Sequence, residues 1–130
     1  MKILLGYNDT DAAGRALSLA REHAKIFKAK VHIITSMEGG DSETPEQIRK
    51  AEKDLEEARA FMEEGGLECE THQVVHGNSP GEDIVWYAQD KAVDLVFVGI
   101  EKKSKTQKLL LGSTAQYVIL RAPCPVTTVK

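Results

Sequence analysis

The sequence has few of the residues that cross-link a chain, and no segment of the kind that spans a membrane. Cysteine occurs twice in 130 residues, at Cys69 and Cys124, without the short spacing of a zinc site or a redox pair. We therefore expect both thiols to be buried or idle. No apolar run approaches the length of about 18 residues that a membrane-spanning helix needs.

An excess of positive charge is also missing, because 17 Lys and Arg stand against 20 Asp and Glu and the formal net charge is -3. Binding to DNA or RNA requires a basic face that displaces counterions from the phosphates. We therefore expect no nucleic-acid partner. The first residues do not read as a signal peptide, and the expectation is a soluble, cytoplasmic protein with no membrane partner.

What the sequence does contain is enough apolar residues, 42% of the chain, for one hydrophobic core. Short β-branched runs alternate with longer segments of helical period, which is typical of a parallel sheet with crossover helices. No linker or internal repeat divides the chain, so residues 1–130 are expected to form a single domain.

Five strands and four helices are predicted in strict alternation. The strands are expected at residues 3–7, 31–36, within 67–76, at 94–99 and at 126–129, and the helices at about 13–27, 45–64, 80–91 and 112–121. Polar residues mark the helix starts, namely capping boxes of Thr44 with Gln47 and of Ser79 with Glu82, one of Asp9, Thr10 and Asp11 for the first helix, and Ser113 for the last.

This alternation predicts an α/β fold, an open, doubly wound, five-stranded parallel sheet with strand order 3-2-1-4-5 and four helices. In such a sheet the ligand crevice lies at the carboxyl ends of the strands, where the strand order reverses. Here that position is between the first and fourth strands. Its lips are expected at residues 6–10 and 99–114, with Ser36 beside them.

The most informative local feature is a pair of glycines on either side of a basic segment. Gly99 ends the apolar run 96–98, and Gly112 opens the last predicted helix together with Ser113 and Thr114. Backbone N–H groups at a helix start lack partners within the helix, and the helix dipole adds about half a positive charge there. The pattern therefore predicts a phosphate-binding site.

These residues make the chain resemble the universal stress protein family over essentially its full length. The nucleotide signature of that family is glycine, two residues, glycine, nine residues, glycine and then serine or threonine. In this chain the marked positions are Gly99, Lys102, Gly112 and Ser113, so three of the four agree. Further similarity lies in residues 109–118, 123–126 and 77–80.

The resemblance implies a fold of the adenine nucleotide alpha hydrolase type and ATP or a related adenine nucleotide, with or without Mg²⁺, as the ligand. By position, Asn8 stands where many members have an aspartate that reaches the adenosine, and Ser36 would contact the adenine through its backbone. Gly99 would approach the ribose and the phosphates. The nucleotide-binding residues that the resemblance implies are Asn8, Ser36, Gly99, Lys102, Gly112, Ser113 and Thr114.

Lys102 fills the second glycine position of the signature, which leaves two interpretations open. A side chain there can clash with the phosphate or strain the backbone by ~1–3 kcal/mol. Against this, four lysines, Lys102, Lys103, Lys105 and Lys108, face one acidic residue, Glu101, and their charge suits a triphosphate. The first interpretation is a nucleotide-binding protein, and the alternative is a nucleotide-independent dimeric stress protein in which Lys102 blocks the site.

Members of the family commonly pair through the last strand, so the resemblance implies a homodimer formed by Val126, Thr127, Thr128 and Val129, an otherwise exposed apolar edge. No general base or metal-binding acidic pair accompanies the predicted phosphate site. We therefore expect a protein of stress response or signalling, not a dedicated enzyme, with at most slow ATP hydrolysis. The four histidines, His23, His32, His72 and His76, are expected to be ordinary surface or edge residues.

Overall fold

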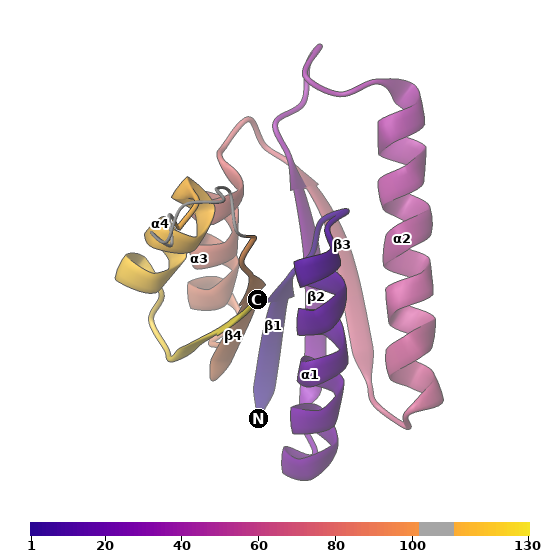
Figure 1. Cartoon of the computed structure of the whole chain (residues 1–130), viewed down its shortest axis with the longest axis vertical. Helices are drawn as coiled ribbons and strands as arrows, with labels where there is room; N and C mark the ends of the chain where they lie inside the picture. The colour runs from indigo at the N-terminus through magenta and orange to yellow at the C-terminus, as the bar shows by residue number, and fades with distance from the viewer. Residues whose placement is uncertain (102–110) are drawn as a thin grey trace.

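A computed structural model describes residues 1–101 and 111–130 of the protein. Strands and helices alternate along the chain (Figure 1). The strands are β1 (Lys2–Gly6), β2 (Lys30–Met37), β3 (Cys69–Val75), β4 (Leu95–Gly99) and β5 (Val126–Val129), and the helices are α1 (Asp11–Phe27), α2 (Pro45–Glu64), α3 (Pro80–Asp90) and α4 (Ser113–Arg121).

All strand pairs are parallel, and the sheet has the order β3-β2-β1-β4-β5. The predicted fold is therefore confirmed. β1 lies at the centre, where Leu4 is opposite His32 on one side and Val96 on the other. After β1 the chain crosses through α1 to β2 on one side, and after β4 it crosses through α4 to β5 on the other side. The switch point of the sheet therefore lies at the carboxyl ends of β1 and β4.

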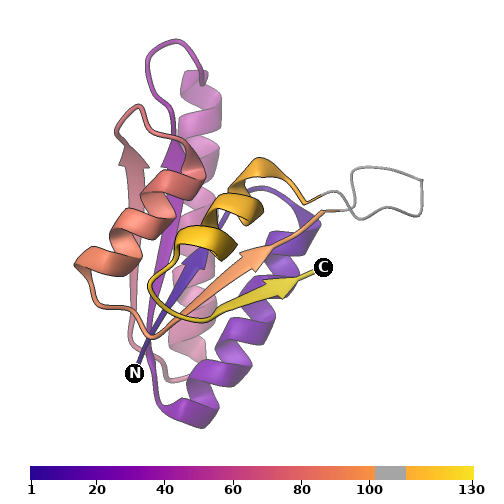
Figure 2. The same ribbon diagram turned by 90° about the vertical axis from the view of Figure 1, so that its left-hand side faces the viewer.

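The helices cover the two faces of the sheet in pairs, α1 and α2 on one face and α3 and α4 on the other (Figures 1 and 2). Side chains alternate between the faces along each strand. In β4, for example, Phe97 packs into the core beneath α1 and α2, whereas Val96 and Val98 pack beneath α3 and α4. Both cores are apolar, which explains the nearly continuous hydrophobic runs of the central strands.

The predicted helix starts are largely as the sequence indicates. Thr10 caps α1, because its hydroxyl oxygen accepts a hydrogen bond of 3.1 Å from the Ala13 N–H. Both predicted capping boxes are present, at the starts of α2 and α3. In residues 1–101 and 111–130 no helix has the length and apolarity that crossing a membrane requires. Cys69 and Cys124 are free and half-buried.

One prediction about the histidines is wrong. His32 is neither a surface nor an edge residue, since it is 3% exposed and lies between the sheet and α3. The reason is the position of β2 inside the sheet, where both faces of the strand are covered. Val31 and Ile33 point into one core, and His32 and Ile34 point to the opposite side.

The end of β4 packs tightly against the start of α1. A Cβ atom on Gly99 would lie 2.6 Å from the carbonyl carbon of Ala12 and 2.7 Å from the backbone nitrogen of Ala13. These are backbone atoms of the first turn of α1 and cannot rotate away. Glycine at position 99 is therefore required by the packing of the strand on the helix, whether or not a ligand approaches it.

Gly99→Ala is expected to destabilise the protein by ~1–3 kcal/mol, because the added methyl group forces the strand and the helix apart. Gly14→Ala is the matched control, since no described atom lies within 4 Å of a Cβ at this site inside α1. Replacing a helical glycine by alanine should stabilise the fold by about 0.5–1 kcal/mol. Urea denaturation of both variants measures the difference. Equal midpoints for the two variants would contradict the packing described for Gly99.

Candidate functional site

The carboxyl ends of β1 and β4 border a small crevice of about 100 Å³ at the switch point of the sheet. Tyr7 and Asn8 follow β1, Ser36 lies near the end of β2, Gly99 ends β4, and Thr114 belongs to the first turn of α4. The structure thus brings Asn8, Ser36, Gly99 and Thr114 to one place. The sequence predicts this convergence, although the residues are far apart along the chain.

A larger hollow of about 270 Å³ adjoins the crevice, and both are lined by Tyr7, Asn8 and Ser36. Its opposite wall is α2, which contributes Lys50 and Asp54 from one helix face. Because the two hollows share three residues, one elongated ligand can extend from α2, past the end of β1, to the start of α4.

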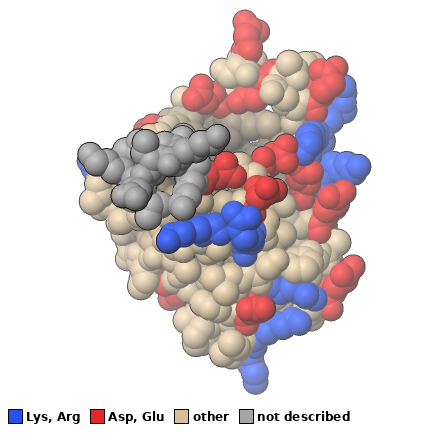
Figure 3. Space-filling view, in the orientation of Figure 1, with Lys and Arg blue, Asp and Glu red and all other residues tan. Residues whose placement is uncertain are grey.

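The charged groups that line the larger hollow are mainly carboxylates, since Asp9, Glu43 and Asp54 stand against one cation, Lys50. Figure 3 shows acidic side chains gathered between the upper end of α1 and α2. The Lys50 Nζ lies 3.1 Å from an Asp9 oxygen and 2.9 Å from an Asp54 oxygen, and these hydrogen bonds raise the pKa of Lys50. Such a surface suits ligand groups that donate hydrogen bonds, and it repels phosphate.

Asn8 is oriented by the residue that caps α1. The Thr10 hydroxyl donates a hydrogen bond of 2.7 Å to the Asn8 side-chain oxygen, while the same hydroxyl oxygen accepts from the Ala13 N–H. The carbonyl oxygen of the Asn8 amide is thereby engaged within the loop. Its NH₂ group is the part that can donate to a ligand in either hollow.

A buried carboxylate that the sequence reasoning did not single out holds Ser36. The Ser36 hydroxyl donates a short hydrogen bond to Asp83, and the Asn78 side-chain amide donates to the other oxygen of the same carboxylate at 3.3 Å. Asp83 is 3% exposed. Since the hydroxyl is committed to Asp83, Ser36 would contact a ligand through its backbone, the contact predicted for it.

A signal for Asp83 is present in the sequence. The residue lies one position before Ile84 and four before Tyr87, both of which are buried in the core. An acidic residue on the buried face of a helix requires a partner, because an unpaired carboxylate in the core is costly. That partner comes from β2 and is not evident from the helix alone.

The start of α4 differs from the prediction at Ser113. Gly112 is the N-cap residue, with extended backbone angles, and none of the described side chains caps the helix. Ser113 is instead the first residue inside α4, where its hydroxyl is no longer in the N-cap position. Among the described residues, no side chain accepts from the N–H groups of the first turn, and such groups can bind an anion.

Gly112 and Ser113 begin the helix whose next residue, Thr114, lines the crevice. Lys102, the residue at the second glycine position of the signature, lies outside the described residues. So do the other lysines of the basic segment, Lys103, Lys105 and Lys108.

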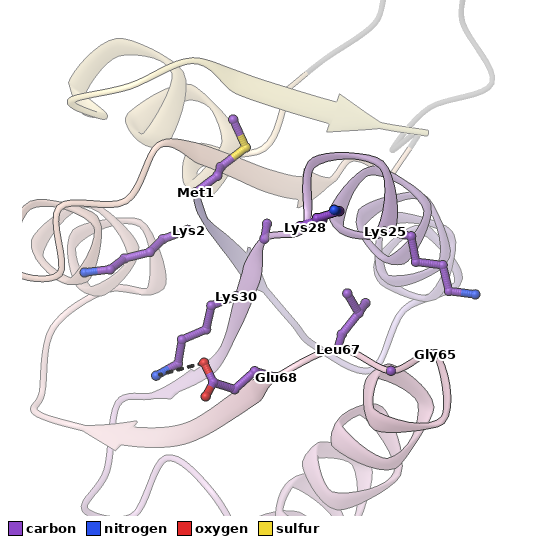
Figure 4. A pocket seen from close by; sticks show the side chains of 10 residues that line it. Met1, Lys2, Lys25, Lys28, Lys30, Gly65, Leu67 and Glu68 are labelled. Carbon is purple, nitrogen blue, oxygen red and sulfur yellow. Dashed lines mark ion pairs between the residues drawn. The ribbon is translucent and has the colours of Figure 1, made fainter.

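A hollow of about 600 Å³ lies at the opposite end of the sheet, at the amino ends of β1, β2 and β3 (Figure 4). It is surrounded by Lys2, Lys25, Lys28 and Lys30. These lysines do not converge on a common point. Lys2 and Lys25 point away from each other, and Lys30 pairs with Glu68 at 3.8 Å. The hollow is an open surface depression with dispersed charges, and it does not offer the geometry of an anion site.

The protein has a doubly wound parallel sheet, and strand ends and a helix N-terminus form a crevice at its switch point. These features define the class of α/β proteins that bind a ligand at the carboxyl ends of the strands. The sequence model of the universal stress protein family matches residues 1–130, and the chain therefore belongs to this family.

Relatives of known structure and sequence agree with this membership. A universal stress protein of Thermus aquaticus is 30% identical over 134 residues, which cover 98% of this chain and 97% of the relative. The structure of a universal stress protein from Archaeoglobus fulgidus is 34% identical in sequence, with a TM-score of 0.86. The alignment covers 100% of this chain and 93% of the Archaeoglobus fulgidus chain. A second structure from Archaeoglobus fulgidus, in complex with dAMP, has 31% identity and a TM-score of 0.83, with coverage of 100% and 98%.

Asp83→Ala is expected to destabilise the protein by ~1–3 kcal/mol, because the Ser36 hydroxyl and the Asn78 amide lose a buried acceptor. Asp90→Ala removes an exposed carboxylate from the end of the same helix. That control should change the free energy of unfolding by no more than about 0.5 kcal/mol. Urea denaturation at pH 7 compares the two variants with the unsubstituted protein. Similar, small effects in both would show that Asp83 does not hold Ser36.

Proposed function

We propose that this protein binds ATP or a related adenine nucleotide in the crevice between β1 and β4 and acts as a homodimer in stress response or signalling. The convergence of Asn8, Ser36, Gly99 and Thr114 at the switch point carries this proposal. A relative with 31% identity and full coverage of this chain has been solved with dAMP, which supports an adenine nucleotide as the ligand.

The distribution of charge supports one orientation of the nucleotide. The acidic hollow beside α2 suits the nucleoside, because the adenine amino group and the ribose hydroxyls are hydrogen-bond donors that carboxylates accept. The start of α4 suits the phosphates, because its uncapped N–H groups and helix dipole attract negative charge. The nucleoside would therefore lie between Asn8 and α2, with the phosphates directed toward Gly112, Ser113 and Thr114.

Binding without efficient hydrolysis is part of the proposal. Asp9 is paired with Lys50, and Asp83 is hydrogen-bonded to Ser36 and Asn78. These carboxylates near the crevice already have partners, so neither is well placed to hold Mg²⁺ or to act as a general base for an attacking water. A protein with this site would report the presence of the nucleotide through its surface rather than consume it.

Isothermal titration calorimetry with adenosine, AMP and Mg-ATP tests the proposal. The affinity should rise from adenosine to ATP as phosphates are added. Lys102→Glu should weaken ATP binding about tenfold or more, because it reverses the charge of one lysine in the basic segment of the nucleotide signature. It should leave adenosine binding unchanged. The control is Lys25→Glu, which makes the same change in charge beside the hollow at the amino ends of the strands. It should alter neither affinity.

Two results would contradict the proposal in different ways. No binding of any of the three ligands by the unsubstituted protein or by Lys102→Gly would remove the nucleotide site. Binding by Lys102→Gly alone would establish the alternative, a nucleotide-independent stress protein whose crevice is closed by Lys102.

The edge of the sheet at β5 supports the homodimer. The carbonyl oxygen of Pro125 accepts a hydrogen bond of 3.0 Å from Val96 in β4, and that of Val129 accepts one of 2.7 Å from Ile100, the residue after β4. Since the direction of backbone groups alternates along a strand, Thr127 also faces β4 and the backbone groups of Thr128 face away from it. In the part of the chain that the structure describes, β5 ends the sheet, so those groups are available to the same strand of a second copy.

Thr128→Pro is expected to convert the dimer to a monomer, because proline removes the outward N–H while leaving the hydrogen bonds to β4 in place. Thr128→Val keeps that N–H and a β-branched side chain, and it should remain dimeric. Sedimentation velocity measures the oligomeric state, and thermal unfolding checks that both variants fold. A dimer of unchanged stability in folded Thr128→Pro would rule out pairing through β5.

A further inference from the structure

Three side chains able to bind a metal meet on the sheet face that carries α3 and α4, away from the crevice. His32 in β2 lies directly opposite Glu70 in β3 in the strand register. His72 follows Glu70 by two residues and therefore lies on the same face of β3. One potential ligand atom from each of the three residues lies within 4.8 Å of the others. Ser36 lies four positions after His32 along β2, which places the cluster about 13 Å from the crevice lining.

The burial of His32 is not explained by packing alone. Its Nδ1 lies 3.2 Å from a Glu70 oxygen and 3.1 Å from the Tyr87 hydroxyl. Its Nε2 is fully buried and has no hydrogen-bond partner among the described residues. The edge of the ring that faces Glu70 and Tyr87 is therefore the Nδ1 edge, and Nδ1 is the nitrogen through which His32 can take part in the cluster.

The spacing of the cluster fits a small divalent cation. Zinc binds histidine nitrogen and carboxylate oxygen at about 2.0–2.2 Å in a tetrahedral arrangement, which separates neighbouring ligand atoms by about 3.4 Å. The His32 Nδ1 and the Glu70 oxygen are 3.2 Å apart, which is a hydrogen-bond distance and is also close to this value. The other ligand atoms are up to 4.8 Å apart. Because Glu70 and His72 are exposed, rotation of their side chains can shorten these separations to about 3.4 Å.

The geometry fixes which nitrogen of His32 is the ligand. Its Nδ1 is the ring atom that faces the Glu70 carboxylate, so His32 would bind the cation through Nδ1, in the neutral tautomer that carries its proton on Nε2. The Tyr87 hydroxyl lies 3.1 Å from the same nitrogen and is a hydrogen-bonding group beside the cluster.

We propose that His32, Glu70 and His72 bind a divalent transition-metal cation of the zinc type, with water in the remaining coordination position. Two imidazoles and one carboxylate favour zinc over magnesium or calcium, which prefer oxygen ligands. The cation would join β2 to β3, a strand at the edge of the sheet, and would stabilise that edge. This site is independent of the proposed nucleotide crevice.

Lys30 is the competitor for this cation. Its Nζ lies 3.4 Å from the same Glu70 oxygen and 3.8 Å from Glu68. On metal binding, Lys30 can keep Glu68 as its partner while Glu70 turns to the cation. Removal of the lysine charge should therefore strengthen metal binding, an effect that would not be expected for zinc held loosely by scattered surface histidines.

The test is a zinc titration of the nucleotide-free protein, residues 1–130, against a chromophoric chelator, with Co²⁺ absorption as a probe of ligand geometry. We expect one equivalent of Zn²⁺ per chain and a rise in the thermal unfolding midpoint. His72→Ala should weaken binding about tenfold or more. His76→Ala removes an exposed histidine that follows the same strand but lies outside the cluster, and it should leave the affinity unchanged. Lys30→Met should bind zinc more tightly.

Three results would overturn the proposal. These are no binding at Zn²⁺ concentrations up to about 100 µM, equal loss of affinity in His72→Ala and His76→Ala, or no gain in Lys30→Met together with an octahedral Co²⁺ spectrum. Because both histidines that are changed lie on the surface, neither variant depends on refolding the core around a substituted His32. Nucleotide is absent throughout, so the outcome does not depend on whether the crevice binds ATP.

Discussion

The architecture of the crevice depends on one close contact, the approach of β4 to the first turn of α1. A Cβ at position 99 would lie 2.6 Å from the Ala12 backbone, so only glycine allows the strand to end there. The same first turn is capped by Thr10, which in turn orients Asn8. Packing of the strand on the helix, capping of the helix and placement of the Asn8 side chain in the crevice lining are therefore parts of one local structure.

The crevice and its neighbouring hollow differ in charge, and this difference gives the site a direction. Carboxylates of Asp9 and Asp54 share the Lys50 ammonium on the side of α2. On the other side, α4 begins at Gly112 with no described side chain as a cap. A ligand with hydrogen-bond donors at one end and negative charge at the other complements both sides. Adenine nucleotides have this polarity, and the relative solved with dAMP belongs to the same family.

The sequence was sufficient to predict the sheet order and the convergence of Asn8, Ser36, Gly99 and Thr114, because both follow from the alternation of strands and helices. Residue periodicity was not sufficient for features that depend on how elements pack. Ser113 has the chemistry of a capping residue, yet the chain enters α4 one residue earlier, at Gly112. Asp83 and His32 are polar residues whose partners lie on other elements, so their burial follows only from the phase of α3 and the position of β2 inside the sheet. Lys102, on which the choice between the two functional interpretations depends, lies outside the described residues.

The central claim is that the strand ends at the switch point form the nucleotide site, and chemical-shift mapping with ¹⁵N-labelled protein tests it most directly. On titration with AMP, the backbone amides of Asn8, Ser36, Gly99 and Thr114 should shift together and saturate at one equivalent. The amide resonance of Glu68, which lines the lysine-rich hollow at the amino ends of the strands, should not shift. Shifts confined to residues around that hollow, or no shifts at saturating AMP, would contradict the claim.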